Sequence, residues 1–263
     1  MSKRTLVSLA TILLLLVAVA CKKEAEVAKT EEGPAPAAAP TAAIDPATAA
    51  TIKGKVAFEG SAPKPRRIRM DAEATCMGLH KEPVYSEEVV VNDNGTLRSV
   101  FVYVKEGLGD RTFPTPKEPV VLDQRGCMYN PHVSGIQVGQ DLHVLNSDPT
   151  THNIHPVPKN NREWNTSMPP GGEKLVRNFP REEVLVPFKC NVHPWMKSYL
   201  GVLKHPFFAV TSTQGTFEIK GLPPGEYVIE AWHEKYGTLQ QKVTLAAKES
   251  KAVDFTFKGT GGD

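Results

Sequence analysis

Proline and glycine interrupt this chain so often that mostly strands and turns are expected. The sequence holds 22 prolines and 20 glycines, and both residue types break helices. Short stretches of alternating apolar and polar residues lie between them, and no stretch keeps an apolar period of 3.6 residues. Residues 71–80 alone could hold one short helix. The sequence therefore predicts an all-β fold of many short strands, an antiparallel sandwich or barrel.

Turn residues separate the expected strands at short intervals. The turn Asp93-Asn94-Gly95 predicts a hairpin between its two neighbouring strands, because Asn-Gly readily takes positive φ. The expected strands are residues 51–58, 88–91, 99–104, 119–122, 134–138, 141–145, 184–188, 200–211, 216–219, 226–233, 239–245 and 252–257.

The first residues are typical of a secretory signal peptide. Lys3 and Arg4 precede an uncharged segment, residues 6–20. That segment would form about 22 Å of helix, whereas a bilayer core needs about 30 Å. A signal peptide over residues 1–20 is therefore favoured over a membrane span. The end of this segment, Ala18-Val19-Ala20-Cys21, resembles a bacterial lipobox, which implies a lipidated Cys21. The alternative is an ordinary signal peptide with an incidental cysteine.

Residues 21–51 are rich in alanine and proline and predict a tether. The segment has too few large apolar residues to offset its ordering entropy. Signal peptide, lipidated cysteine and tether together predict an extracytoplasmic lipoprotein on the periplasmic side of the inner or outer membrane. Disulfides can form in such a compartment. The whole chain has 31 basic and 29 acidic residues, so no broad basic surface for nucleic acid is expected.

Residues 190–196 form the strongest chemical motif. Cys190, His193 and Met196 supply a thiolate, an imidazole and a thioether within one loop between two expected strands. Thiolate and thioether ligands select copper, and imidazole suits it as well. A site of two histidines and one cysteine needs a further histidine from elsewhere. His152 is the favoured candidate and His155 the alternative.

Two-residue gaps on both sides of His193 belong to a longer ordered pattern. A G-x-D strand, N-x-D, H-N-x-H, M-P-P-G and C-x-x-H-x-x-M follow one another in the chain. This order resembles the cupredoxins, the blue copper proteins, of the amicyanin and plastocyanin type, over roughly residues 119–204. The resemblance implies one type 1 copper site with ligands His152, Cys190, His193 and axial Met196. Met168 is the alternative thioether.

The same resemblance implies further roles. Asn153 would tie the two ligand loops together. The protein would transfer single electrons between redox partners, such as a cytochrome or a membrane oxidoreductase. Electrons would pass through a solvent-facing edge of His193, with Pro194 and Trp195, next to Pro131, as a docking patch.

A second resemblance lies near the C-terminus. Residues 215–227 read G-x-F-x-I-x-G-L-P-P-G-x-Y, which resembles the carboxypeptidase regulatory-like domain, a small transthyretin-like β-sandwich. This likeness informs the fold and says little about function. The expected domains are N-terminal strands and extension (52–118), a cupredoxin-like copper domain (119–209) and a regulatory-like region (210–259). The sequence leaves open whether the copper domain is inserted into the regulatory-like sandwich, or whether all strands share one extended sandwich.

Cys76 and Cys127 are the remaining cysteines, and a disulfide between them is expected in an oxidising compartment. The alternative is a second metal site that also uses His80 and His132.

Other functional classes fit the sequence less well. An enzyme with several copper sites would need more paired histidines, and a haem cytochrome would need C-x-x-C-H, which the sequence lacks. No enzymatic activity is therefore expected. A copper carrier or sensor could use the same ligands, and a structural surface module is the remaining alternative.

Overall fold

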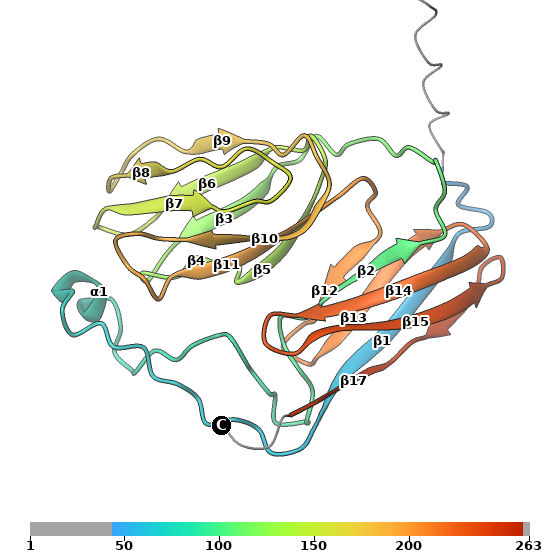
Figure 1. Cartoon of the computed structure of the whole chain (residues 1–263), viewed down its shortest axis with the longest axis horizontal. Coiled ribbons are helices and arrows are strands. Elements are labelled where there is room, and N and C mark those ends of the chain that lie inside the picture. The colour runs from blue at the N-terminus through green and yellow to red at the C-terminus, as the bar shows by residue number, and fades with distance from the viewer. Residues whose placement is uncertain (1–43, 260–263) are drawn as a thin grey trace, which may run out of the picture. The chain divides into compact units, whose positions relative to one another are not determined.

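The computed structural model describes residues 44–259, and every structural statement below concerns these residues (Figure 1). The expected signal peptide, Cys21 and most of the expected tether lie outside them. No helix within residues 44–259 is long and apolar enough to span a membrane.

The described chain is all-β apart from one helical turn, as the sequence predicts. It contains two groups of strands, each built from two sheets. Most strand pairs are antiparallel, but β3 pairs with β6, β5 with β11, and β1 with both β16 and β17 in parallel.

The first sandwich has the sheets β13-β1-β16, in which β17 also pairs with β1, and β12-β2-β14-β15. Its strands are β1 (Ala50–Glu59), β2 (Phe101–Glu106), β12 (Phe208–Val210), β13 (Thr216–Leu222), β14 (Gly225–His233), β15 (Gly237–Leu245), β16 (Ser250–Ala252) and β17 (Phe255–Lys258).

The second sandwich has the sheets β5-β11-β10-β7-β8 and β4-β3-β6-β9. Its strands are β3 (Val120–Gln124), β4 (Tyr129–Asn130), β5 (Val133–Gln137), β6 (Leu142–Asn146), β7 (His152–Pro156), β8 (Thr166–Met168), β9 (Leu175–Arg177), β10 (Glu183–Lys189) and β11 (Lys197–Leu203). All of them lie between β2 and β12 in the chain, so the second sandwich is an insertion in the first.

The strands expected within residues 52–118 do not form a unit of their own. β1 pairs with β13, and β2 pairs with β12 and β14. Each therefore completes a sheet whose other strands come from the C-terminal region.

The hairpin predicted around Asp93-Asn94-Gly95 forms, but it is shorter than expected. The Gly95 N–H donates to the carbonyl of Asn92, with φ of +74° at Gly95. Beyond the turn, the N–H groups of Asn92 and Arg98 donate to the carbonyls of Thr96 and Val90, on either side of a bridge between Val91 and Leu97. The expected second arm, residues 99–104, does not take part. Residues 101–104 are all buried, so β2 lies between two other strands instead of forming one arm of a hairpin.

The expected strand 200–211 is two strands. β11 ends at Leu203 in the second sandwich, and β12 begins at Phe208 in the first. Pro206 lies in the intervening segment, where its missing N–H cannot join a ladder. The chain therefore passes from one sandwich to the other at this point.

Phe101 of β2 joins the two sandwiches. Its ring is fully buried and stacks on that of Phe208, with centroids 5.5 Å apart. Gly135 and Gly201 are partners across β5 and β11. A Cβ at Gly201 would lie 2.3 Å from Cζ of Phe101, and one at Gly135 would lie 2.8 Å from its Cε2. The paired glycines therefore leave the space that this ring fills.

Gly201→Ala should lower the free energy of unfolding by about 1–3 kcal/mol, because overfilling a packed core forces side chains and backbone to shift. Urea denaturation of the full chain measures the change. Gly78→Ala is the matched control, since no atom lies within 4 Å of a Cβ there. Equal stability of the two variants would contradict the role given to Phe101.

His233 of β14 makes the stability of the first sandwich depend on pH. The ring is buried beside Tyr236 and Phe257, and its Nδ1 accepts the N–H of Lys235. Burial lowers the pKa of His233 from 6.5 to about 4. The unfolded chain therefore binds the proton more tightly, and the stabilising contribution is complete above about pH 6.5 and is lost as pH falls towards 4.

His233→Gln should remove about 2 kcal/mol of the stability loss between pH 8 and pH 5, because the substituted residue cannot take up the proton. Urea denaturation of wild type and variant at both pH values measures this difference. Identical losses in the two proteins would show that His233 does not carry this pH dependence.

Candidate metal centre

The second sandwich brings the predicted ligands together at one end of its strands. His152 is the first residue of β7, Cys190 directly follows β10, and His193 and Met196 lie in the loop that leads into β11. The loop is closed by two backbone hydrogen bonds, from Cys190 N–H to the carbonyl of Met196 and from Met196 N–H to that of His193. This turn directs side chains of one short segment towards His152.

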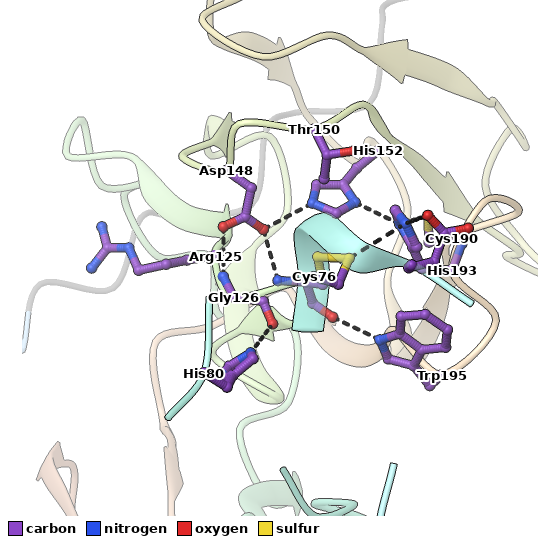
Figure 2. Close-up of a disulfide and its surroundings, with 12 residues drawn as sticks. Cys76, His80, Arg125, Gly126, Asp148, Thr150, His152, Cys190, His193 and Trp195 are labelled. Carbon is purple, nitrogen blue, oxygen red and sulfur yellow. Dashed lines mark hydrogen bonds and ion pairs between the residues drawn. A yellow bond between two sulfur atoms is a disulfide. The ribbon is translucent and has the colours of Figure 1, made fainter. Parts of the chain in front are cut away.

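The Nδ1 atoms of both histidines and the sulfur of Cys190 face one another (Figure 2). The two Nδ1 atoms are 2.8 Å apart, and Cys190 Sγ is 3.9 Å from Nδ1 of His193. The ligand atoms of all three residues lie within 4.8 Å of one another. The two histidines are fully buried, and Cys190 is nearly so.

This donor set fits copper. Two imidazoles and one thiol form the core of a copper site with mixed nitrogen and sulfur ligands. Met196 is fully buried in the same hydrophobic cluster as Cys190. Within residues 44–259, Cys190 is the free cysteine. Two other groups of possible ligand atoms contain Cys76 or Cys127, whose sulfurs are bonded to each other.

Hydrogen bonds prepare the Cys190 sulfur to carry negative charge. Burial alone would raise the pKa of the thiol. The side chain of His152 and the backbone N–H groups of Asn153, His193 and Val192 outweigh this effect, so the pKa of Cys190 is lowered. A metal binds cysteine as the thiolate, so this environment favours the form that coordinates.

The pKa values of the two histidines are shifted in opposite directions. Burial lowers the pKa of His193, and the nearby charge of His152 lowers it further. For His152, burial also acts downwards, but hydrogen bonds to Cys190 and Asp148 and their charges raise its pKa overall. The carboxylate of Asp148 beside His152 is one cause of this difference.

Asn153 joins the two ligand segments, as the cupredoxin resemblance implies. Its Oδ1 accepts the N–H of Asn191 at 2.6 Å and that of Val192 at 3.3 Å, and it lies 3.3 Å from Cys190 Sγ. One side chain on β7 therefore fixes the start of the 190–196 loop.

Asp148 is a site residue that sequence patterns did not single out. Its Oδ2 accepts from Nε2 of His152 at 2.8 Å and from the N–H of Cys127 at 2.7 Å. Its Oδ1 accepts the N–H of Gly126 at 2.6 Å. The N-x-D pattern four residues before His152 contained the signal, but the residues 126–127 that share this carboxylate are distant in sequence.

Tyr129 is a second site residue that the sequence analysis did not name. Its hydroxyl donates to the carbonyls of Asn153 and Lys189, at 2.5 and 3.0 Å, and so joins β7 to β10 behind the site. Burial, followed by the negative charge of Cys190, raises the pKa of this phenol, which keeps the donor protonated.

The alternative ligands occupy other positions. His155 is hydrogen-bonded to Asn191 and Glu163 on the outer side of β7. The sulfur of Met168 accepts from Nε2 of Gln124 at 3.1 Å. Neither therefore competes with His152 or Met196.

Cys76 and Cys127 form the expected disulfide. Nε2 of His80 bonds to the carbonyl of Gly126, and His132 bonds to Glu234 and to the carbonyl of Lys197. The alternative second metal site is therefore not formed.

The solvent-facing edge expected for His193 is a wrong prediction. His193 is fully buried, because its Nε2 faces Cys76 Sγ at 3.6 Å and Glu73 Oε2 at 3.9 Å. Both residues belong to the segment around α1 (Ala74–Gly78), which the disulfide holds over the ligand loop.

The expected docking patch is partly formed. Pro131 and Pro194 are exposed. Trp195 is half-buried, and its indole N–H donates to the carbonyl of Cys127 at 2.9 Å. The Trp195 ring lies beside that of His193, with centroids 5.2 Å apart. The tryptophan is therefore both a structural contact and a partly accessible surface.

A family model matches part of the first sandwich. Residues 204–258 match the carboxypeptidase regulatory-like domain family. A comparison with curated protein sequences finds no match.

Solved structures similar to the chain include three copper proteins, each at a low overall score. The Cu-containing nitrite reductase from Thermus scotoductus SA-01 is 21% identical, with 34% of this chain and 23% of that chain covered and a TM-score of 0.31. A mutant of amicyanin in the Cu(I) form is 20% identical, with 32% and 81% covered and a TM-score of 0.29. The novel purple cupredoxin from Nitrosopumilus maritimus is 21% identical, with 32% and 98% covered and a TM-score of 0.28.

Asp148→Asn should weaken copper binding by about 10–100-fold, the usual cost of disturbing a group that orients a ligand histidine. Competition with a chelator of known affinity measures this change. Asp93→Asn, at an exposed turn position, is the control and should bind as wild type does. Unchanged affinity in Asp148→Asn would contradict the positioning role of this carboxylate.

Proposed function

We propose that the protein is a type 1 (blue) copper protein that carries single electrons between redox partners. The observation that carries this proposal is the convergence of the two Nδ1 atoms and the Cys190 sulfur, while the outer nitrogen of His152 bonds to Asp148. That bond leaves the Nδ1 of His152 directed at the space where an ion would sit.

Bound copper would supply one-electron redox chemistry, and the protein residues would hold its ligands in one arrangement. Asn153 and Asp148 restrain the ligand segments through buried hydrogen bonds. The N–H of His193 donates to the Cys190 sulfur at 3.3 Å. Hydrogen bonds to this sulfur and the hydrophobic shell around a site of this kind adjust its reduction potential. Met196, which is buried in the same cluster as Cys190, would supply a weak thioether ligand.

We further propose that lipid on Cys21 anchors the protein on the extracytoplasmic side of a membrane. The disulfide Cys76–Cys127 supports this compartment, because disulfides persist where the environment is oxidising. The proposed partners are redox proteins such as a cytochrome or a membrane oxidoreductase, and no enzymatic activity is proposed.

A copper carrier or sensor is the second candidate function, and the burial of His193 favours it. A covered imidazole edge places the metal ligands away from a partner's surface, which suits retention of the ion more than rapid electron exchange. Stopped-flow oxidation of the Cu(I) protein by a cytochrome would separate the two functions. An electron carrier should react within milliseconds to seconds, whereas a carrier of the ion should exchange copper without transferring electrons.

Cys190→Ala should abolish the intense visible absorption expected for the Cu(II) form, because that band arises from charge transfer between the thiolate and copper. The measurement is the visible absorption spectrum of the full chain after loading with one equivalent of Cu(II). Met77→Ala is the control and should remain blue, since Met77 is exposed on α1. A colourless wild type that binds no copper would overturn the proposal and leave a structural β-sandwich module.

A further inference from the structure

Residues 70–80 form a cap that closes the outer side of the candidate copper site. The cap contains α1, and Glu73 and Cys76 from it face Nε2 of His193 at 3.9 and 3.6 Å. Figure 2 shows the disulfide directly beside this imidazole. The cap therefore covers the ligand edge that solvent or a partner would otherwise reach.

Few contacts besides the disulfide fix α1 on His193. Cys76 is the one buried residue of α1, and its N-cap residue Glu73 makes no side-chain capping hydrogen bond. Met77, within the same helix, is 53% exposed. His80 adds a hydrogen bond to the carbonyl of Gly126 at 2.8 Å. Met70, at the start of the cap, is also buried in the core cluster that contains Cys190, whereas seven of the ten residues 71–80 are exposed. Residues 71–80 therefore open locally at low cost once the covalent link at Cys76 is removed.

The anchor of the cap is a strained turn that also contacts the second ligand histidine. Gly126 and Cys127 have φ of +65° and +51°, a region that non-glycine residues rarely adopt. Asp148 holds the turn by accepting both backbone N–H groups and also accepts from Nε2 of His152. The cysteine pair therefore lies between the outer nitrogens of both ligand histidines.

We propose that Cys76–Cys127 is a site of thiol–disulfide exchange at which a dithiol opens the copper site. One thiolate of the dithiol attacks a sulfur of the disulfide and forms a mixed disulfide, which its second thiol resolves. Two electrons and two protons pass to the protein, whose S–S bond becomes two S–H groups, while the dithiol becomes a disulfide. Both cysteines are fully buried, so the dithiol reaches a sulfur only during brief local openings of the disulfide form, and reduction then makes the open form persist.

The two redox forms differ in access to His193. In the disulfide form the cap is held on the imidazole and the ligand set is enclosed. In the dithiol form the cap leaves His193, and solvent, small chelators or a partner reach its outer edge. The significance of this change for copper rests on the proposed function, but movement of the cap does not.

Modification of the full-length apoprotein by diethyl pyrocarbonate, mapped by peptide mass spectrometry, tests the proposal without copper. His193 should react at least about tenfold faster after dithiothreitol has reduced the Cys76–Cys127 disulfide to two thiols. The double variant Cys76→Ser with Cys127→Ser should show the same fast reaction without reductant. Met77→Ala, which alters the cap but keeps the disulfide, should react slowly until it is reduced.

His233 is the internal control for unfolding, because it is buried in the first sandwich and should stay unreactive throughout. Unchanged His193 reactivity after confirmed reduction would overturn the proposal. So would a disulfide that is reduced only under conditions where His233 also reacts. A His193 response in a protein that never turns blue would refute the copper function alone, whereas a blue protein without that response would refute this inference alone.

Discussion

The carboxylate of Asp148 is the contact on which the arrangement of the site depends. It is buried, so it requires hydrogen-bond donors to offset the cost of removing its charge from water. The structure supplies three: the His152 ring and the backbone N–H groups of Gly126 and Cys127. One group thereby orients a ligand and holds the turn that carries the disulfide. The position of the cap over His193 follows from that turn.

The two sandwiches are interdependent because the chain leaves the first sandwich, builds the second and then returns. Residues 204–258, which match the regulatory-like family, supply β12 to β17 but lack β1 and β2. Both missing strands precede the insertion. Phe101 of β2 then packs against Gly135 and Gly201 of the inserted sandwich. The regulatory-like region is therefore a complete sandwich only together with the N-terminal strands.

Local features were predictable from the sequence, and long-range ones were less so. Cys190, His193 and Met196 are close in sequence, so their meeting in one loop required only the correct strands on either side. Tyr129 acts through partners more than twenty residues away, and nothing in its local spacing indicates them. Asp148 lies in the local N-x-D pattern before His152, but its bonds to Gly126 and Cys127 also join residues more than twenty apart. The hairpin before β2 forms only next to its turn, because β2 pairs with the distant strands β12 and β14. The prediction that His193 is exposed was wrong because a disulfide between cysteines 51 residues apart in the sequence holds α1 over its ring.

In the proposed function, closure of the outer side of the site would keep a redox partner away from the edge of His193. The His193 edge is covered by Cys76 and Glu73, and the Trp195 ring lies beside the same imidazole. Trp195 is partly exposed and is bonded to the carbonyl of Cys127. A partner that docks on the closed form therefore contacts Trp195 or the cap, and not the imidazole itself. Both of these contacts involve Cys127, which binds the Trp195 indole through its carbonyl and secures the cap through its sulfur.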